Sequence, residues 1–141
     1  MRARRLRRFV SAVLLMALLC TAVLRAANQQ GLRYVTVAEE TLRGYALETV
    51  MPLYPQRARR RNVQGTAVVQ LNVNEQGAVT GVEVLEAPDT LTRESVAQAV
   101  KQWRFKSPTI HGQAVSIRGK LTFYYVIKNG KGQVENPTQF K

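Results

Sequence analysis

Hydrophobic and polar residues alternate along residues 115–127 over a longer stretch than anywhere else in the chain. A period of two is that of a β-strand with one buried face. The expected buried face carries Val115, Ile117, Gly119, Leu121, Phe123, Tyr125 and Ile127. The outer face includes Arg118 and Lys120, and charged outer residues are one way in which a sheet edge avoids pairing with other edges. We therefore expect a long strand with an exposed edge; an ordinary half-buried strand is the alternative.

Two shorter stretches predict a β-hairpin. In residues 66–73 the apolar side chains of one face are Ala67, Val69, Leu71 and Val73. Residues 74–77 supply turn residues and end in Gly77, which adopts a positive φ without strain. The pattern changes faces within residues 78–85, which predicts a bulge near Gly81 or a strand covered on both faces.

The clearest helical pattern begins at Thr92, which is expected to be the N-cap of an amphipathic helix. Apolar residues recur there at the i, i+3, i+4 and i+7 spacing of one helix face. They are Val96, Ala99, Val100 and Trp103. Trp103 and Phe105 are expected to fill the core beneath the sheet, because large aromatic side chains bury the most area.

Proline and arginine dominate the segment before the hairpin. Pro52 and Pro55 hold the residues before them in extended geometry. Pro55 is also expected to open a short helix that continues through residues 57–61, whose arginine run is interpreted as a solvated helix face. Residues 37–50 fit either a short helix or a loosely docked arm, and the pattern leaves both open.

The order short helix, strand, strand, helix, strand predicts an α+β fold. We expect a three-stranded antiparallel sheet with a short N-terminal helix and one main helix packed on it. This domain would span residues 51–128. Residues 28–50 are expected to form a short arm or linker, and residues 129–141 a flexible polar tail.

Residues 1–27 have the composition of an export or anchoring segment. Several arginines, from Arg2 to Arg8, precede an apolar run of 16 residues at positions 9–24, which contains the only cysteine, Cys20. That length lies between the core of a signal peptide and a spanning helix, so cleavage and retention in the inner membrane both stay open. Either outcome places the remaining chain in the periplasm, or at the inner membrane facing the periplasm.

Charge and titratable residues argue against several functions. The net charge is +12, but six arginines flank the apolar run and leave 15 basic against 9 acidic side chains. With export, this balance argues against a nucleic-acid partner. His111 is the only histidine, so neither a metal site nor a cofactor is expected. Asp89, Glu94 and His111 are not spaced as an acid–base pair, so we do not expect an enzyme.

Several short motifs, taken in order, resemble the C-terminal domain of TonB proteins. They are Tyr54-Pro55-x-x-Ala58, residues 65–69, residues 74–79, residues 97–105 with their Trp103-Arg104-Phe105 ending, and Leu121-Thr122-Phe123. The resemblance covers about residues 50–128. The combination of motifs is specific, whereas no single one of them would suffice.

The resemblance implies a periplasmic domain whose last strand pairs with a short extended segment of an outer-membrane receptor. The partner-peptide-binding residues that it implies are Met51, Pro52, Leu53, Tyr54, Arg118, Lys120, Thr122 and Tyr124. The expected function is a cell-envelope protein-binding module that binds a receptor or another envelope protein by strand addition, in TonB-dependent transport. The alternative is a structural or assembly protein that self-pairs through the same edge without transducing energy.

Three departures limit what the resemblance carries over. Only 22 residues, 29–50, separate the N-terminal segment from the domain, where TonB proteins have a long proline-rich linker. Ser11 is followed four positions later by Leu15, where the family's anchor has a histidine that couples it to a proton-driven motor. Met51 stands where well-known members have glutamine. The sequence therefore does not determine coupling to a motor, the receptor and its cargo, or the oligomeric state.

Overall fold

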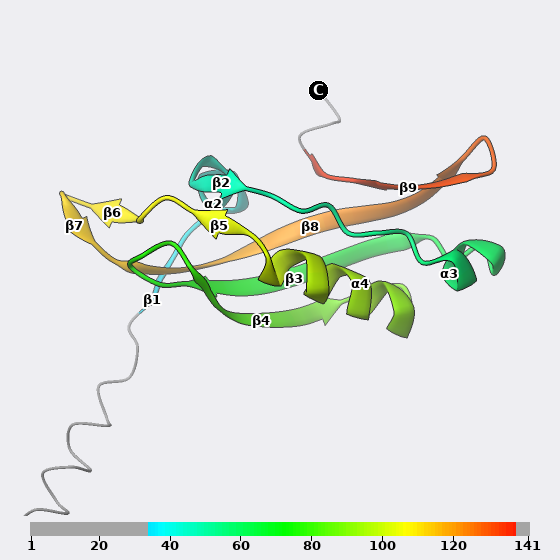
Figure 1. Cartoon of the computed structure of the whole chain (residues 1–141), viewed down its shortest axis with the longest axis horizontal. Coiled ribbons are helices and arrows are strands. Elements are labelled where there is room, and N and C mark those ends of the chain that lie inside the picture. Colours follow the sequence, from blue (N-terminus) through cyan, green and yellow to red (C-terminus); the bar gives the residue numbers. More distant parts are fainter. Residues whose placement is uncertain (1–33, 138–141) are drawn as a thin grey trace, which may run out of the picture. The chain divides into compact units, whose positions relative to one another are not determined.

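The computed structural model describes residues 34–137, so the expected signal peptide or anchor lies outside the described residues. Within residues 34–137, no helix is both long and apolar enough to span a membrane. In chain order (Figure 1) the elements are β1 (Tyr34–Thr36), α2 (Glu39–Gly44), β2 (Ala46–Glu48), α3 (Gln56–Arg60), β3 (Gly65–Val73), β4 (Val79–Glu86), α4 (Thr90–Lys101), β5 (Arg104–Phe105), β6 (Thr109–Ile110), β7 (Gln113–Ala114), β8 (Ser116–Lys128) and β9 (Lys131–Glu135).

Five strands form the main sheet, in the order β1–β8–β3–β4, with β9 also paired to β8. β3, β4 and β8 are the three antiparallel strands that the sequence predicts. β1 adds a short parallel pairing and β9 an antiparallel one, both along the side of β8 that faces away from β3. The α+β fold is therefore confirmed, whereas the predicted count of three strands is too low.

The hydrophobic core lies between the inner face of this sheet and α4 (Figure 1). Trp103 and Phe105 follow α4 and fill this space as predicted, with 1% and 3% of their surface exposed and 6.0 Å between their ring centroids. The buried face of β8 also follows the predicted alternation. Its fully or almost fully buried side chains are Ile117, Leu121, Phe123 and Tyr125.

Two local details of the predicted elements need correction or refinement. The N-cap of α4 is Asp89, not Thr92, because the Asp89 carboxylate accepts the Thr92 amide at 2.8 Å. Thr92 returns a hydrogen bond through its hydroxyl, which accepts the Asp89 amide at 3.0 Å and completes a capping box. The bulge predicted near Gly81 is confirmed, since the β3–β4 register shifts between Asn72 and Val73, opposite Gly81.

Two segments beyond the predicted domain pack on the sheet. Of the two readings open for residues 37–50, the short helix is confirmed: α2 docks through Leu42, which is fully buried against Gly119 of β8. A Cβ atom at position 119 would lie 2.9 Å from the Leu42 side chain. The expected flexible tail is wrong for residues 131–135, which form β9 and turn back along β8 after Asn129-Gly130.

The Asn74–Gly77 turn is locked against the end of the α4 segment. Gly77 has φ +82° and accepts the Phe105 amide at 2.9 Å, so closely that a Cβ atom there would overlap the Phe105 carbonyl oxygen. Gly112 has a similar φ of +79°, with no heavy atom within 4 Å of an added Cβ. Alanine at either position would therefore carry backbone strain, whereas only alanine at position 77 would also clash with a neighbour.

We expect Gly77→Ala to lower the free energy of unfolding more than Gly112→Ala does. Both variants acquire a left-handed alanine, at about 1–2 kcal/mol. Gly77→Ala adds an overpacking penalty of about 1–3 kcal/mol, because the backbone at Phe105 has to move. Urea unfolding followed by Trp103 fluorescence measures both. Equal decreases in the free energy of unfolding would show that the turn accommodates the added Cβ atom without cost to the core.

Candidate protein-binding groove

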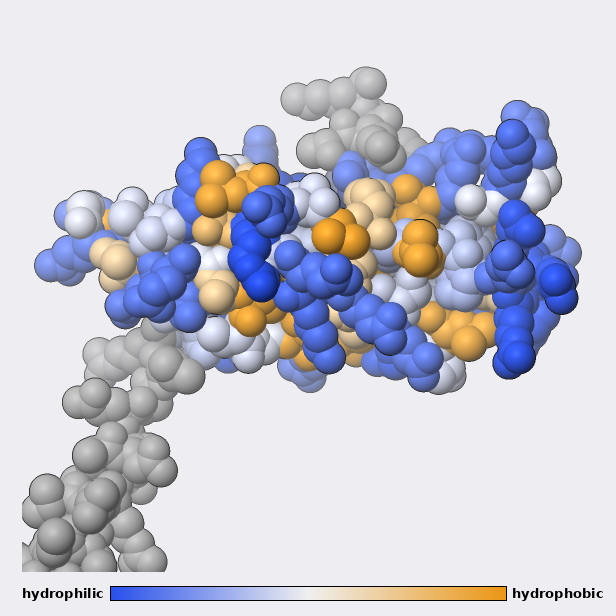
Figure 2. Space-filling view, viewed as in Figure 1, coloured by the Kyte–Doolittle hydropathy of each residue, from blue (hydrophilic) through white to orange (hydrophobic). Residues whose placement is uncertain are grey.

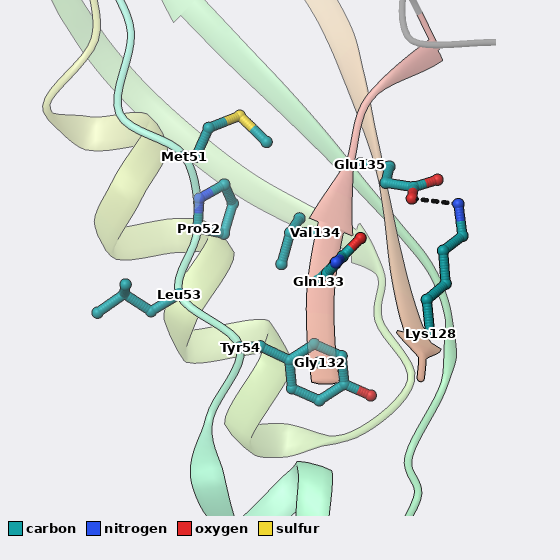
Figure 3. Close-up of a pocket in the computed structure, with 9 residues that line it drawn as sticks. All are labelled: Met51, Pro52, Leu53, Tyr54, Lys128, Gly132, Gln133, Val134 and Glu135. Atoms are coloured by element: carbon teal, nitrogen blue, oxygen red, sulfur yellow. Dashed lines mark hydrogen bonds and ion pairs between the residues drawn. The ribbon is translucent and has the colours of Figure 1, made fainter. Parts of the chain in front are cut away.

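A groove of about 850 Å³ lies between an extended segment and β9 (Figure 3). One wall is the segment Met51–Tyr54, and the other is formed by residues of β9. The lining residues are Met51, Pro52, Leu53, Tyr54, Lys128, Gly132, Gln133, Val134 and Glu135. The volume lies within the usual range for ligand sites, although this groove is open along its length.

Met51–Tyr54 forms a rigid wall because its backbone is fixed from beneath. The Trp103 indole donates to the Val50 carbonyl at 2.9 Å, and the Ser95 hydroxyl donates to the Leu53 carbonyl at 2.5 Å. Pro52 is buried, whereas Leu53 is 81% exposed and Met51 39% exposed. The prolines thus hold an extended ridge that presents apolar side chains to solvent.

Tyr54 lies at one end of the groove. Its hydroxyl donates to the Val63 carbonyl, and its ring packs edge-on against Tyr125, with 5.4 Å between centroids. A Cβ atom at Gly132 would lie 2.8 Å from the Tyr54 ring, so only glycine lets β9 come this close. Partial burial, with a smaller contribution from the nearby Asp89 carboxylate, raises the pKa of Tyr54 above its usual value of 10.

The outer edge of β9 carries backbone groups that no described strand pairs with. β9 pairs with β8 alone among the described strands. The Thr122 amide of β8 points away from β3, so Val126 of β8 points its backbone groups toward β9. Its partner Gln133 therefore faces β8, and the amides of the neighbouring Gly132 and Val134 point away from β8, at the outer edge. Lys128 and Glu135 brace the hairpin with an ion pair of 2.5 Å.

The exposed edge predicted for β8 is wrong, because the protein's own chain covers it. β1 pairs with Ser116–Arg118, and the Val37 amide donates to the Arg118 carbonyl at 2.9 Å. β9 covers the C-terminal part of β8, from Tyr124 to Lys128. Backbone groups left open between two strands invite further pairing, so covering them removes a site of aggregation as well as a site for a guest.

The gap between β1 and β9 is closed by side chains of α2. The Glu39 carboxylate accepts both the Thr122 amide and the Thr122 hydroxyl at 2.9 Å. Arg43 donates to the Thr122 carbonyl at 3.0 Å and pairs with Glu39 at 2.7 Å. The guanidinium carbon of Arg43 also lies 5.6 Å from the centre of the Phe123 ring. The Glu39 carboxylate thereby supplies the acceptor, and the Arg43 guanidinium the donor, that a neighbouring strand would otherwise provide.

The structure separates the predicted binding residues into two groups. The four residues Met51, Pro52, Leu53 and Tyr54 lie together along the groove. The four residues of β8 lie elsewhere: Arg118 stacks on Tyr34 and donates to Asn72, Lys120 is exposed, Thr122 is held by α2, and Tyr124 pairs with Glu135. Their predicted roles therefore remain predictions, and none of the four lines the groove.

The β9 side of the groove was missed by the sequence reasoning. Asn129-Gly130 is a two-residue connection between strands, with φ values of +51° and +72°. An Asn-Gly pair between a strand and a following Val-containing stretch is a strong hairpin signal. The signal was present in the sequence, but the polar composition of residues 131–135 favoured a tail.

Replacing Glu39 by alanine tests whether α2 protects the edge of β8. The Thr122 amide loses its acceptor, which costs about 1–3 kcal/mol for a half-buried donor. We expect hydrogen exchange at Thr122 to accelerate by about tenfold or more, since 1.4 kcal/mol corresponds to a factor of ten. Amide exchange followed by NMR measures this directly.

Gln64→Ala provides the matched control for this experiment, because the Gln64 side chain accepts the Ile127 amide at 2.9 Å. That variant should release Ile127 and leave Thr122 protected. Unchanged exchange at Thr122 in Glu39→Ala would mean that β1 and β9 protect this amide without the carboxylate.

Alkaline pH should destabilise the fold through Tyr125. Burial is the main reason why the pKa of the fully buried Tyr125 phenol rises to about 12 from its usual 10. The stabilisation is complete below pH 10 and is lost as the pH rises from 10 to 12, because the unfolded chain releases the proton first. Between these values the free energy of unfolding should fall less steeply in Tyr125→Phe than in the unchanged chain, by up to about 2 kcal/mol. Parallel slopes in urea titrations would contradict this.

A groove with an extended apolar wall and an open strand edge has the geometry of a module that binds an extended stretch of another protein. Residues 50–127 match the family described as Gram-negative bacterial TonB protein C-terminal. The chain therefore belongs to this family, as its motifs predicted.

Several relatives and one solved structure share this domain. Protein TonB of Yersinia enterocolitica is 40% identical over 63 residues, which cover 44% of this chain and 25% of the relative. Protein TonB of Pseudomonas aeruginosa is 28% identical over 78 residues, covering 55% and 23%. The solution NMR structure of the Pseudomonas aeruginosa TonB CTD superposes with a TM-score of 0.52 at 27% identity, covering 60% of this chain and 86% of that one. The chain thus matches about a quarter of the length of these two TonB proteins.

Proposed function

We propose that this domain binds an extended segment of an outer-membrane receptor, or of another envelope protein, by strand addition. The guest lies in the groove between Met51–Tyr54 and β9, on the periplasmic side of the inner membrane. Binding of this kind serves TonB-dependent transport, in which a receptor segment is the point of attachment. Residues 1–27 supply the export or anchoring step.

The observation that carries the proposal is the edge of β9 that no described strand covers, beside a groove with a rigid apolar wall. The outward amides of Gly132 and Val134 supply main-chain hydrogen bonds to any extended guest. Met51 and Leu53 supply apolar contacts. Pro52 and the hydrogen bonds from Trp103 and Ser95 already fix the backbone of this segment, so binding loses little further conformational entropy there. The proposed site keeps the four predicted residues of the ridge and replaces the edge of β8 by that of β9.

A variant pair at position 134 tests strand addition. Val134→Pro removes an amide at the outer edge of β9, whereas the ladder between β8 and β9 uses the amides of its neighbours. Val134→Ala truncates the same side chain and keeps the amide. We expect peptides from receptor N-terminal segments to bind the alanine variant and to bind the proline variant at least about tenfold more weakly, because one or more main-chain hydrogen bonds are lost.

Titration of the full chain by NMR with these peptides gives the affinity and the residues affected. Equal affinity in both variants would rule out the β9 edge as the acceptor. Concentration-dependent dimerisation that Val134→Pro abolishes, without peptide binding by either variant, would instead favour the assembly protein that self-pairs.

A further inference from the structure

One end of the groove opens onto a cluster of exposed cationic side chains, which we call the cationic end. It consists of the α3 arginines and their neighbour, with two lysines of the β8–β9 turn: Arg57, Arg59, Arg60, Arg61, Lys128 and Lys131. Figure 2 shows the strongly hydrophilic surface at the end of the molecule where Figure 1 places α3 and the β8–β9 turn.

The cationic end is connected to the groove by hydrogen bonds as well as by sequence. α3 begins two residues after Tyr54, whose hydroxyl reaches over α3 to the Val63 carbonyl. Gln64 then accepts the Ile127 amide at 2.9 Å, next to Lys128, which itself lines the groove. A guest strand that continues past Tyr54 therefore runs onto these cations.

Within residues 34–137, the four arginines have no ion-pair partner. Among the residues that the structure describes, Lys128 is paired with Glu135, whereas no carboxylate lies within 4.0 Å of a nitrogen of the four arginines. The nearby Asp89 is engaged as the N-cap of α4. Arg57 lies one turn from Arg60 and Arg61, a like-charge spacing that destabilises a helix by about 0.2–0.5 kcal/mol per pair. Among the described residues, the fold therefore gains no ion pair from the four arginines.

We propose that the cationic end extends the binding site and selects guest segments whose apolar stretch is followed by carboxylate side chains. The apolar part fills the groove along Met51 and Leu53, and the carboxylates lie beyond Tyr54, where guanidinium groups bind them in a two-pronged arrangement. This inference rests on the proposed function, since it names the chemistry of the guest.

A protein segment fits this arrangement better than a lipid surface does. The cations lie at one end of the groove, and the apolar ridge of Met51 and Leu53 lies along that groove instead of around the arginines. Charges of this kind accelerate association and weaken with salt, so the preference for acidic guests is expected to be strongest at low ionic strength.

The test uses the full chain and three synthetic peptides. Each contains the same six valine, threonine and isoleucine residues. In the first peptide four glutamates lie at one end of this stretch, and in the second four glutamines lie at that end. In the third the four glutamates lie at the opposite end. We expect the acidic peptide whose glutamates reach the cationic end to bind about tenfold more tightly than the glutamine peptide in 50 mM salt. The difference should shrink below about threefold in 500 mM salt. Fluorescence anisotropy measures each dissociation constant.

Two double charge reversals locate the effect. Arg59→Glu with Arg60→Glu should remove the preference for the acidic peptide while the glutamine peptide keeps its affinity. Lys101→Glu with Lys106→Glu makes the same change in net charge at two exposed residues outside α3 and the β8–β9 turn, and should leave the preference in place. Circular dichroism confirms that both variants are folded.

Each other outcome is decisive. Equal binding of acidic and glutamine peptides overturns the inference and leaves the proposed function standing, whereas binding of none of the three overturns both. An equal effect of the two double reversals would assign the preference to net charge, against a selective cationic end. Arginine-dependent binding to vesicles of anionic phospholipid, with no preference among peptides, would assign the cluster to a membrane surface and overturn the inference.

Discussion

The thirteen-residue strand β8 must satisfy backbone groups along both of its edges, and the rest of the fold follows from how it does so. β3 serves one edge along most of its length. The other edge is shared by β1, by side chains of α2 and by β9. No one of these pieces is long enough to cover it alone, so segments from both ends of the described chain meet at this strand.

The closure by Glu39 and Arg43 is unusual in its chemistry. A carboxylate and a guanidinium take the place of a backbone carbonyl and amide, and their charges strengthen the hydrogen bonds to Thr122. The pair is half-buried, and Arg43 also lies against the Phe123 ring. The result is an edge that cannot be extended by a further strand without displacing a charge pair and the buried Leu42.

Elements with a sustained hydrophobic period could be predicted from the sequence. β3, β8 and α4 have such a period, and the core positions of Trp103 and Phe105 could be predicted as well. β1 has three residues and is defined only by its partner on β8, so no local period marks it. The Asp89 cap was missed because Asp and Thr are similarly good caps and both were available within one turn.

The candidate site shows the same division between local and tertiary information. Proline geometry marked the ridge at Met51–Tyr54, because a proline acts on its own neighbour. The identity of the facing strand depends on a long-range choice, since β9 and a foreign strand compete for the same hydrogen-bonding partners along β8. The Asn129-Gly130 pair indicates that a hairpin can form, but the short and polar residues 131–135 carry no hydrophobic period that would show β9 occupying this edge.

The lock between Gly77 and Phe105 has a practical consequence for where this molecule tolerates added mass. Hairpin tips are ordinarily the places to insert a tag or a fluorophore, yet the tip at residues 74–77 is a joint between the sheet and the helix segment. The tip at His111-Gly112 is open on all sides, with both residues exposed and no atom near an added Cβ. A reporter attached there would leave the core, the ridge and the arginines undisturbed.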